Sequence, residues 1–218
     1  MALGLILNLK AQNQQNISLF PGYTHQSFYS MENHEIMKVD NENWDLAFST
    51  DIYSANIRIN DGKGVELYTY NLGDISSWNS INNSTPNILT TRMYNSDTSW
   101  NYGAFVMNQS SDMFDYGWGV YNIQTHHIIG DSVFLIKTVN GNWKKLLIES
   151  KASGEYFFKY ANLDGSNEIS ESIQASNYSD KRFIYYSLDN DATLDREPSL
   201  SDWDITFTRY ITPVQGMP

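Results

Sequence analysis

Apolar and polar residues alternate in two related six-residue stretches near opposite ends of the chain. The first is Asn-Trp-Asp-Leu-Ala-Phe at residues 43–48, and the second is Asp-Trp-Asp-Ile-Thr-Phe at residues 202–207. In both stretches the Trp, the Leu or Ile, and the Phe fall at every second position, which is the period of a β-strand with one buried face. A Trp and a Phe on one face can bury about 150–250 Å² each. The pattern therefore predicts two related β units, from the two ends of the chain, that close one core.

A second shared phrase precedes each of these stretches. Residues 29–33 read Tyr-Ser-Met-Glu-Asn, and residues 186–190 read Tyr-Ser-Leu-Asp-Asn. Each six-residue stretch also carries an aspartate directly after its Trp, Asp45 in the first copy and Asp204 in the second. We expect these two side chains either to point to the opposite face of the strand or to tie down the turn that enters it.

Hairpin signals are clearest in the middle of the chain. Residues 132–139 and 142–150 flank Asn140-Gly141, a pair that adopts the positive φ angles of a two-residue hairpin turn. The first of these strands is apolar without alternation at 133–136, so we expect it to be central and covered on both faces. Residues 52–59 alternate and turn at Asp61-Gly62 into 65–70, which predicts another hairpin.

The remaining strands are shorter, and one long segment lacks a strand pattern. Residues 79–98 are rich in Asn, Ser and Thr, which predicts a long loop suited to a lid or a binding arm. Asp74 is placed to cap a helical turn that runs through Trp78. The segment 168–175 fits either a helical or a strand period, and we favour a strand. Further strands are expected at 17–20, 26–31, 101–107, 117–123, 155–162 and 183–188. The predicted fold is all-β, a single domain of mainly antiparallel sheet with few short helical turns.

Composition and charge narrow the class of protein. A chain of 218 residues can bury a full core without a metal or a disulfide, and it contains no Cys, which excludes thiol nucleophiles and thiolate metal sites. The net charge of −11 repels phosphate backbones, so we do not expect nucleic-acid binding. Fifteen Tyr, ten Phe and six Trp, with many Asn and Ser, suit an exported β protein.

The two termini carry separate signals. The apolar run within residues 1–12 ends at Ala11 before a polar stretch, which is typical of a signal-peptide remnant; a short strand within the fold is the alternative. This run is too short to span a membrane, and no other segment of the sequence has a spanning pattern. Residues 213–218 are rich in Pro and Gly and predict the start of a linker to a further module. The β domain is predicted to cover residues 13–212.

Candidate chemistry is sparse. His126 and His127 are adjacent, and in a strand their rings would face opposite sides, so that both could not easily serve one ion. Their alternative interpretation is one surface His and one partly buried, hydrogen-bonded His. Met113 lies in a turn crowded with aromatic residues, and Met107 precedes it. A Met or His in an aromatic cleft suits an iron porphyrin, because the sulfur or imidazole binds the iron while flat rings cover the macrocycle; otherwise such a Met fills a core.

Motifs for catalysis and for dedicated metal sites are missing from the sequence. There is no His-Glu-x-x-His run, no Gly-x-Ser-x-Gly elbow and no Gly-rich phosphate loop. Asp189, Asp191 and Asp195 offer oxygen ligands for calcium, but without the Gly and Glu of an EF-hand loop a solvated acidic turn is favoured. A pair of glycosidase carboxylates cannot be identified from spacing alone. We therefore predict a protein that is not an enzyme, with no catalytic residues and no metal site of its own.

The repeated Trp-Asp-Leu-Ala-Phe and Trp-Asp-Ile-Thr-Phe phrases resemble the signature of the HmuY-like proteins of Bacteroidota. The strand at residues 131–138, its Asn-Gly turn and the strand at 143–148 resemble that family too, and the likeness extends from about Tyr29 to Tyr210. The resemblance implies an all-β exported protein, attached to or released from the outer cell surface. It also implies haem binding in the best-known members, where two His, or pairs that contain Met, hold the iron on extended arms. The chain also looks like flavobacterial surface proteins that carry such a domain ahead of a C-terminal sorting module.

Two main hypotheses follow for function. The first is an exported, non-enzymatic binding protein for haem or a similar flat ring, with His126, His127, Met107 and Met113 as candidate iron ligands. In this hypothesis Lys144 or Lys145 pairs with a propionate. The second is a surface adhesion or glycan-binding module that uses exposed aromatic side chains such as Trp100, Tyr102 and Trp118. A glycosidase with two facing carboxylates is a third option.

Overall fold

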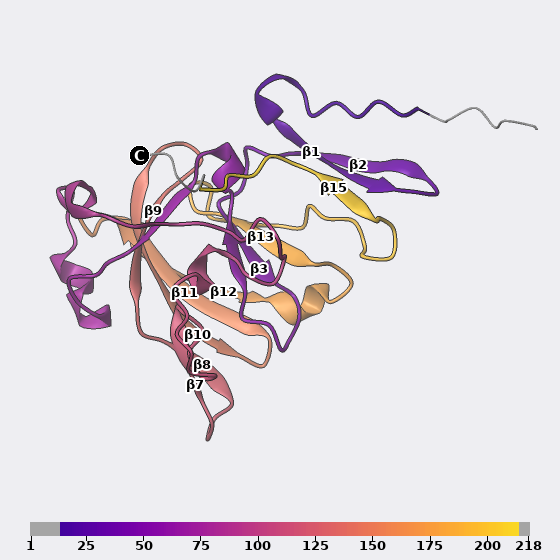
Figure 1. The fold of residues 1–218 in the computed structure, drawn as a ribbon. Coiled ribbons are helices and arrows are strands. Elements are labelled where there is room, and N and C mark those ends of the chain that lie inside the picture. The colour runs from indigo at the N-terminus through magenta and orange to yellow at the C-terminus, as the bar shows by residue number, and fades with distance from the viewer. Residues whose placement is uncertain (1–13, 214–218) are drawn as a thin grey trace, which may run out of the picture.

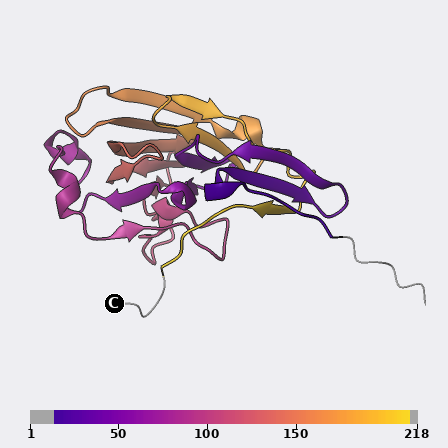
Figure 2. The same cartoon turned by 90° about the horizontal axis from the view of Figure 1, so that it is seen from above.

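The computed structural model describes residues 14–213, and within them the strands form three antiparallel sheets (Figure 1). The small sheet has the order β15-β1-β2, with β1 at His25–Ser30, β2 at His34–Asp40 and β15 at Ile205–Phe207. The four-stranded sheet has the order β14-β13-β3-β4 (Ala192–Leu194, Phe183–Ser187, Leu46–Ser49 and Ile57–Ile59). The prediction of an all-β fold of mainly antiparallel sheet is confirmed. The small sheet lies at one end of the molecule in both views (Figures 1 and 2).

The large sheet has eight strands. Six of them have the order β12-β11-β10-β9-β5-β6, at Ile169–Gln174, Glu155–Asn162, Trp143–Ala152, Val133–Lys137, Glu66–Thr69 and Arg92–Met93. The other two, β7 at Gly119–Asn122 and β8 at His127–Gly130, form a hairpin that joins β10 through β8 and projects from the sheet (Figure 1). Helical structure in the described residues is confined to short 3-10 turns, at Pro21–Tyr23, Asp61–Lys63, Ile75–Ser80, Thr85–Ile88, Ala104–Val106 and Ala175–Tyr178.

The strongest sequence signals are confirmed. The Asn140-Gly141 turn joins β9 to β10, with Gly141 at φ 84°. Strand β9 is central and covered on both faces, because Phe134 packs into the main core while Leu135 packs with Trp78 in a second cluster. Asp74 caps the turn at Ile75–Ser80.

Three local predictions are wrong. Residues 17–20 form no strand. Strands β4 and β5 do not pair as a hairpin, because the 3-10 turn Asp61–Lys63 directs them into different sheets. The segment 101–107 forms no strand, and Ala104–Val106 within it is a 3-10 turn. The side chain of Asn56 accepts the Gly103 N–H, and that of Asn95 accepts the Ala104 N–H at 3.1 Å. These side-chain acceptors take the backbone donors that a strand would use.

The two related stretches exchange strands. Strand β3 of the first copy pairs with β13, which precedes the second copy, and places Leu46 opposite Tyr186. Strand β15 of the second copy pairs with β1, which precedes the first copy, and places Ile205 opposite Tyr29. Because these positions correspond in the repeat, the two ends of the chain are related by an internal pseudo-twofold arrangement.

The indole side chains repeat the same contact. Trp44 packs edge-on against Tyr185, with ring centroids 4.9 Å apart, and Trp203 packs edge-on against Phe28 at 5.1 Å. The prediction that both copies close one core is nevertheless wrong for the second. Phe48 is fully buried under the large sheet, whereas its counterpart Phe207 is 36% exposed, since no sheet of the described residues covers that face.

The two aspartates accept backbone N–H groups from segments far away in the sequence. The carboxylate of Asp45 accepts the N–H groups of Val139 and Leu188, each at 2.8 Å. That of Asp204 accepts the N–H of Met31, the counterpart of Leu188, at 2.7 Å. Burial raises the pKa of Asp45 to about 6, and the two backbone hydrogen bonds oppose that rise. Neither carboxylate accepts an N–H from the turn that enters its own strand, so that expected role is wrong: both side chains hold segments far away in the sequence.

The predicted signal remnant at residues 1–12 lies outside the described residues, as does the predicted linker apart from Pro213. Within residues 14–213, no helix has both the length and the apolar character needed to cross a membrane.

Candidate functional site

The two adjacent histidines lie at the tip of the β7–β8 hairpin. The side chain of Asn122 accepts the N–H groups of Gln124 and Thr125, at 2.9 and 3.1 Å, and so closes the turn. His126 follows with φ 58°, in the left-handed region that non-Gly residues rarely adopt, and His127 begins β8. Strand alternation therefore does not apply to this pair, and both side chains line one cleft.

We call this hollow the His cleft, and it has a volume of about 620 Å³. Besides the two histidines, its lining includes Tyr53, Tyr116 and Tyr121. The hydroxyl of Tyr121 lies 2.7 Å from Nδ1 of His126. This contact orients the imidazole and leaves its Nε2 as the nitrogen that can reach a ligand. The cleft is open to solvent, because Tyr53 is 90% exposed.

Lys151 of β10 builds one wall of the His cleft. Its ammonium group donates to the carbonyl oxygens of Asp51, Ile52 and Ser54, with distances of 2.9 Å to Asp51 and 3.1 Å to Ile52. Burial lowers the pKa of Lys151 to about 8. These bonds hold the segment that carries Tyr53 against the sheet. Sequence reasoning missed this lysine, Tyr53 and Tyr121, and it included Tyr116 only in the aromatic turn around Met113, because these positions are spread over segments that only the fold brings together.

Of the two candidate methionines, Met113 lies on the segment that contacts the β7–β8 hairpin. It is 77% exposed and precedes Phe114, whose ring stacks on that of Tyr121 with centroids 6.0 Å apart. Met107 follows the Ala104–Val106 turn, and its sulfur accepts the N–H of Tyr94 at 3.3 Å. Neither methionine belongs to the lining of the His cleft.

The candidate lysines also lie outside the His cleft lining. Lys145 is buried, with its ammonium 2.9 Å from the carbonyl oxygen of Trp78 and 4.7 Å from the Trp78 ring centroid. Burial lowers the pKa of Lys145. Lys144 lies 3.5 Å from the side-chain oxygen of Asn162 and over the ring of Tyr160. The structure thus brings together His126 and His127 but neither lysine.

The aromatic residues proposed for glycan contact have separate locations. Trp118 is fully buried and donates its indole N–H to the carbonyl oxygen of Ala55 at 2.9 Å, so its expected exposure is wrong. Tyr102 is 58% exposed beside Tyr116 in a hollow next to the His cleft. Trp100 is 39% exposed and lines a different cavity, where the small sheet meets the four-stranded sheet.

The acidic turn near the second repeat serves the fold. The carboxylate of Asp191 accepts the hydroxyl of Tyr160 at 2.8 Å, and that of Asp189 accepts the side-chain amide of Asn142 at 3.0 Å. Over residues 14–213, no group of three or more His, Cys, Asp or Glu side chains is placed to hold a metal ion.

Comparisons of this chain with protein-family models, with curated proteins and with solved structures gave no match.

Proposed function

We propose that this chain is an exported, non-enzymatic binding protein that carries a flat macrocycle such as haem in the His cleft. The observation that supports the proposal is the shared lining of one open cleft by His126, His127 and three tyrosines. Export is supported by the apolar N-terminal run in the sequence.

The chemistry of the cleft suits a porphyrin as cargo. A neutral imidazole is an axial ligand of haem iron, and the tautomer in which Nδ1–H of His126 donates to the Tyr121 hydroxyl oxygen leaves the lone pair of Nε2 for the iron. The flat rings of Tyr53, Tyr116 and Tyr121 offer apolar surface to the macrocycle. The volume of the His cleft, about 620 Å³, lies within the range of about 300–1,000 Å³ for ligand pockets. Met113, exposed on the segment beside β7 but outside the lining of the cleft, would be the second residue to hold the iron.

A matched control for His126 exists in the other hairpin. His34 has φ 68°, and its Nδ1 lies 3.2 Å from the hydroxyl of Tyr29, five residues earlier, as Tyr121 is for His126. His34 thus has the same backbone conformation and tyrosine partner, on the small sheet rather than in the His cleft. A difference in haem binding between His126→Ala and His34→Ala would therefore be due to the cleft and not to the hairpin geometry.

The test is a haem titration followed by absorbance under oxidising and reducing conditions. We expect a shifted Soret band for the wild-type protein and for His34→Ala, and a weakened or altered band for His126→Ala or His127→Ala. Loss of the sulfur in Met113→Ala should change the spectrum, whereas Met107→Ala should not. An unchanged haem spectrum on mixing with the wild-type protein, in both redox states, would rule out this ligand.

A further inference from the structure

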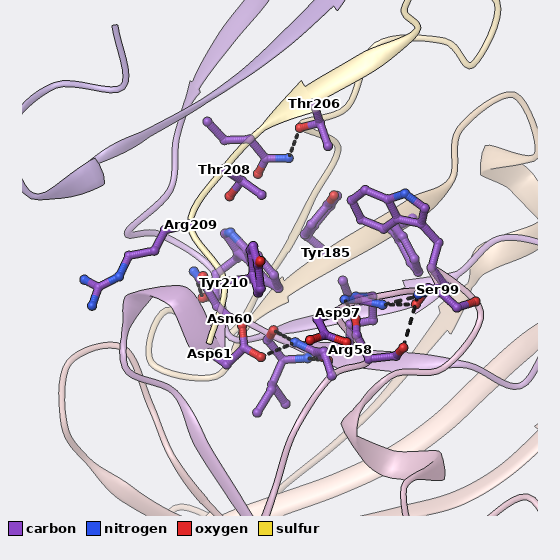
Figure 3. A pocket seen from close by; sticks show the side chains of 18 of the residues that line it. Arg58, Asn60, Asp61, Asp97, Ser99, Tyr185, Thr206, Thr208, Arg209 and Tyr210 are labelled. Carbon is purple, nitrogen blue, oxygen red and sulfur yellow. Dashed lines mark hydrogen bonds between the residues drawn. The ribbon is translucent and has the colours of Figure 1, made fainter. Parts of the chain in front are cut away.

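A second cavity, separate from the His cleft, lies where the four-stranded sheet meets the small sheet, and we call it the junction cavity. Its volume is about 330 Å³. Strands β3, β4 and β13 form its floor, residues 95–100 form one side, and the C-terminal segment 206–210 forms the other. Figure 3 shows Thr206 and Thr208 on this segment across from Asp97 and Ser99, with Tyr185 and Tyr210 between them.

The walls of the junction cavity are aromatic. Trp44, Phe183 and Tyr185 lie on the outer face of the four-stranded sheet and are buried. Trp100 and Tyr210 stand at the sides and remain 39% and 61% exposed. The guanidinium groups of Arg58 and Arg182 lie 5.2 and 5.7 Å from the Trp100 ring centroid, so Tyr210 offers a ligand the more open aromatic surface.

The loop that carries Trp100 is held in place before any ligand arrives. The guanidinium of Arg58 donates to the carbonyl oxygens of Ser96 and Ser99, at 3.1 and 3.0 Å. The side-chain amide of Asn56 donates to the carbonyl oxygen of Trp100 at 2.7 Å. A preformed site loses less conformational entropy when it binds a ligand.

The charged side chains of the junction cavity give its lining no net positive charge. The guanidinium of Arg58 is already bonded to loop carbonyls, and Arg209 turns away from the other labelled side chains (Figure 3) to lie over the ring of Tyr23. Asp61 is 4% exposed and accepts the side-chain amide of Asn95 at 2.9 Å, which leaves Asp97 as the carboxylate at the rim. The lining carries two arginines and two aspartates, so a phosphate or a carboxylate ligand would gain no net attraction from it.

We propose that the junction cavity binds a neutral sugar ring, at a site independent of the His cleft. A pyranose has an apolar C–H face, which suits Trp100 and Tyr210, and hydroxyl groups around its edge, which suit the carboxylate of Asp97 and the hydroxyls of Ser99 and Thr208. The volume lies at the lower end of the range for ligand pockets, about 300–1,000 Å³, and limits the enclosed part to one or two rings. Because the lining comes from both ends of the chain, the strand exchange creates the site.

A glycan array of neutral and acidic oligosaccharides tests this assignment, followed by calorimetric titration of the best neutral hit. We expect Trp100→Ala and Asp97→Ala each to weaken binding about tenfold or more, since one loses a stacking surface and the other a charge-assisted hydrogen bond. Tyr102→Ala is the matched control, because Tyr102 is exposed on the same chain segment but does not line the junction cavity. Its affinity should equal that of the wild type.

Folding is checked for each variant by circular dichroism, and Asp97→Ala, at an exposed rim position, keeps the test valid if Trp100→Ala is unstable. An array without neutral hits overturns the proposal, as does a hit whose affinity survives both substitutions. Haem-loaded and haem-free protein should bind the sugar equally. If haem fails to bind while the sugar binds, only the haem assignment fails.

Discussion

The corresponding aspartates of the two repeats allow a controlled test of how burial changes the contribution of one carboxylate to the free energy of unfolding. Asp45 is 1% exposed and accepts two backbone N–H groups, whereas Asp204 is exposed and accepts one. Asp45→Ala leaves two N–H groups without their acceptor, at about 1–3 kcal/mol each. Asp204→Ala leaves the N–H of Met31, a 69% exposed residue, to water, and should cost below about 1 kcal/mol.

The cost of Asp45→Ala should also depend on pH. The folded pKa of about 6 exceeds the ordinary value of 3.8, so the folded state binds the proton more tightly than the unfolded state. The contribution of Asp45 to stability is therefore largest at low pH and is lost as the pH rises through 6. Between pH 5 and pH 7.5 this difference amounts to about 1.4 kcal/mol, so the variant should be more destabilised, relative to wild type, at pH 5.

Guanidinium chloride unfolding, followed by tryptophan fluorescence at pH 5 and pH 7.5, measures both effects. We expect Asp45→Ala to lower the unfolding free energy by clearly more than Asp204→Ala at pH 5, and by an amount that shrinks at pH 7.5. Equal losses for the two variants, or a loss for Asp45→Ala that does not change with pH, would refute the assigned role of burial.

Two further substitutions probe the junction between the sheets. In Gly62→Ala the new Cβ would lie 2.1 Å from the carbonyl oxygen of Arg209, so the C-terminal segment must shift, and tryptic cleavage after Arg209 should accelerate. Gly64→Ala, which meets no atom within 4 Å, is its control and should pay only for its positive φ of 92°, about 1 kcal/mol; equal cleavage rates would contradict the predicted clash. Asn95→Ala removes two hydrogen bonds to the backbone of Ile59 and two others, and should cost about 2–5 kcal/mol in thermal or denaturant unfolding. A loss below about 1 kcal/mol would show that water replaces those contacts.

Local pattern was sufficient for much of the fold. The alternation in residues 43–48, the Asn140-Gly141 turn and the unbroken apolar run at 133–136 each predict a strand or turn that the structure contains. Such features depend on side-chain period and on the φ preferences of two or three neighbouring residues, and both are properties of a short segment. The repeat also indicated that two related β units come from opposite ends of the chain.

Only the tertiary structure decided how those units combine and where ligands can bind. The same phrase buries Phe48 but leaves Phe207 exposed, because the large sheet covers one copy and not the other. The left-handed φ of His126 depends on its turn, and that single angle brings two adjacent histidines to one cleft. The side chain of Asn95 accepts the N–H of Ala104, where a 3-10 turn replaces the predicted strand, and the hydrophobic period of the segment does not indicate this contact. The sequence by itself predicted most of the strands and the clearest turns, while contacts between residues far apart in the chain determined burial, strand exchange and both cavities.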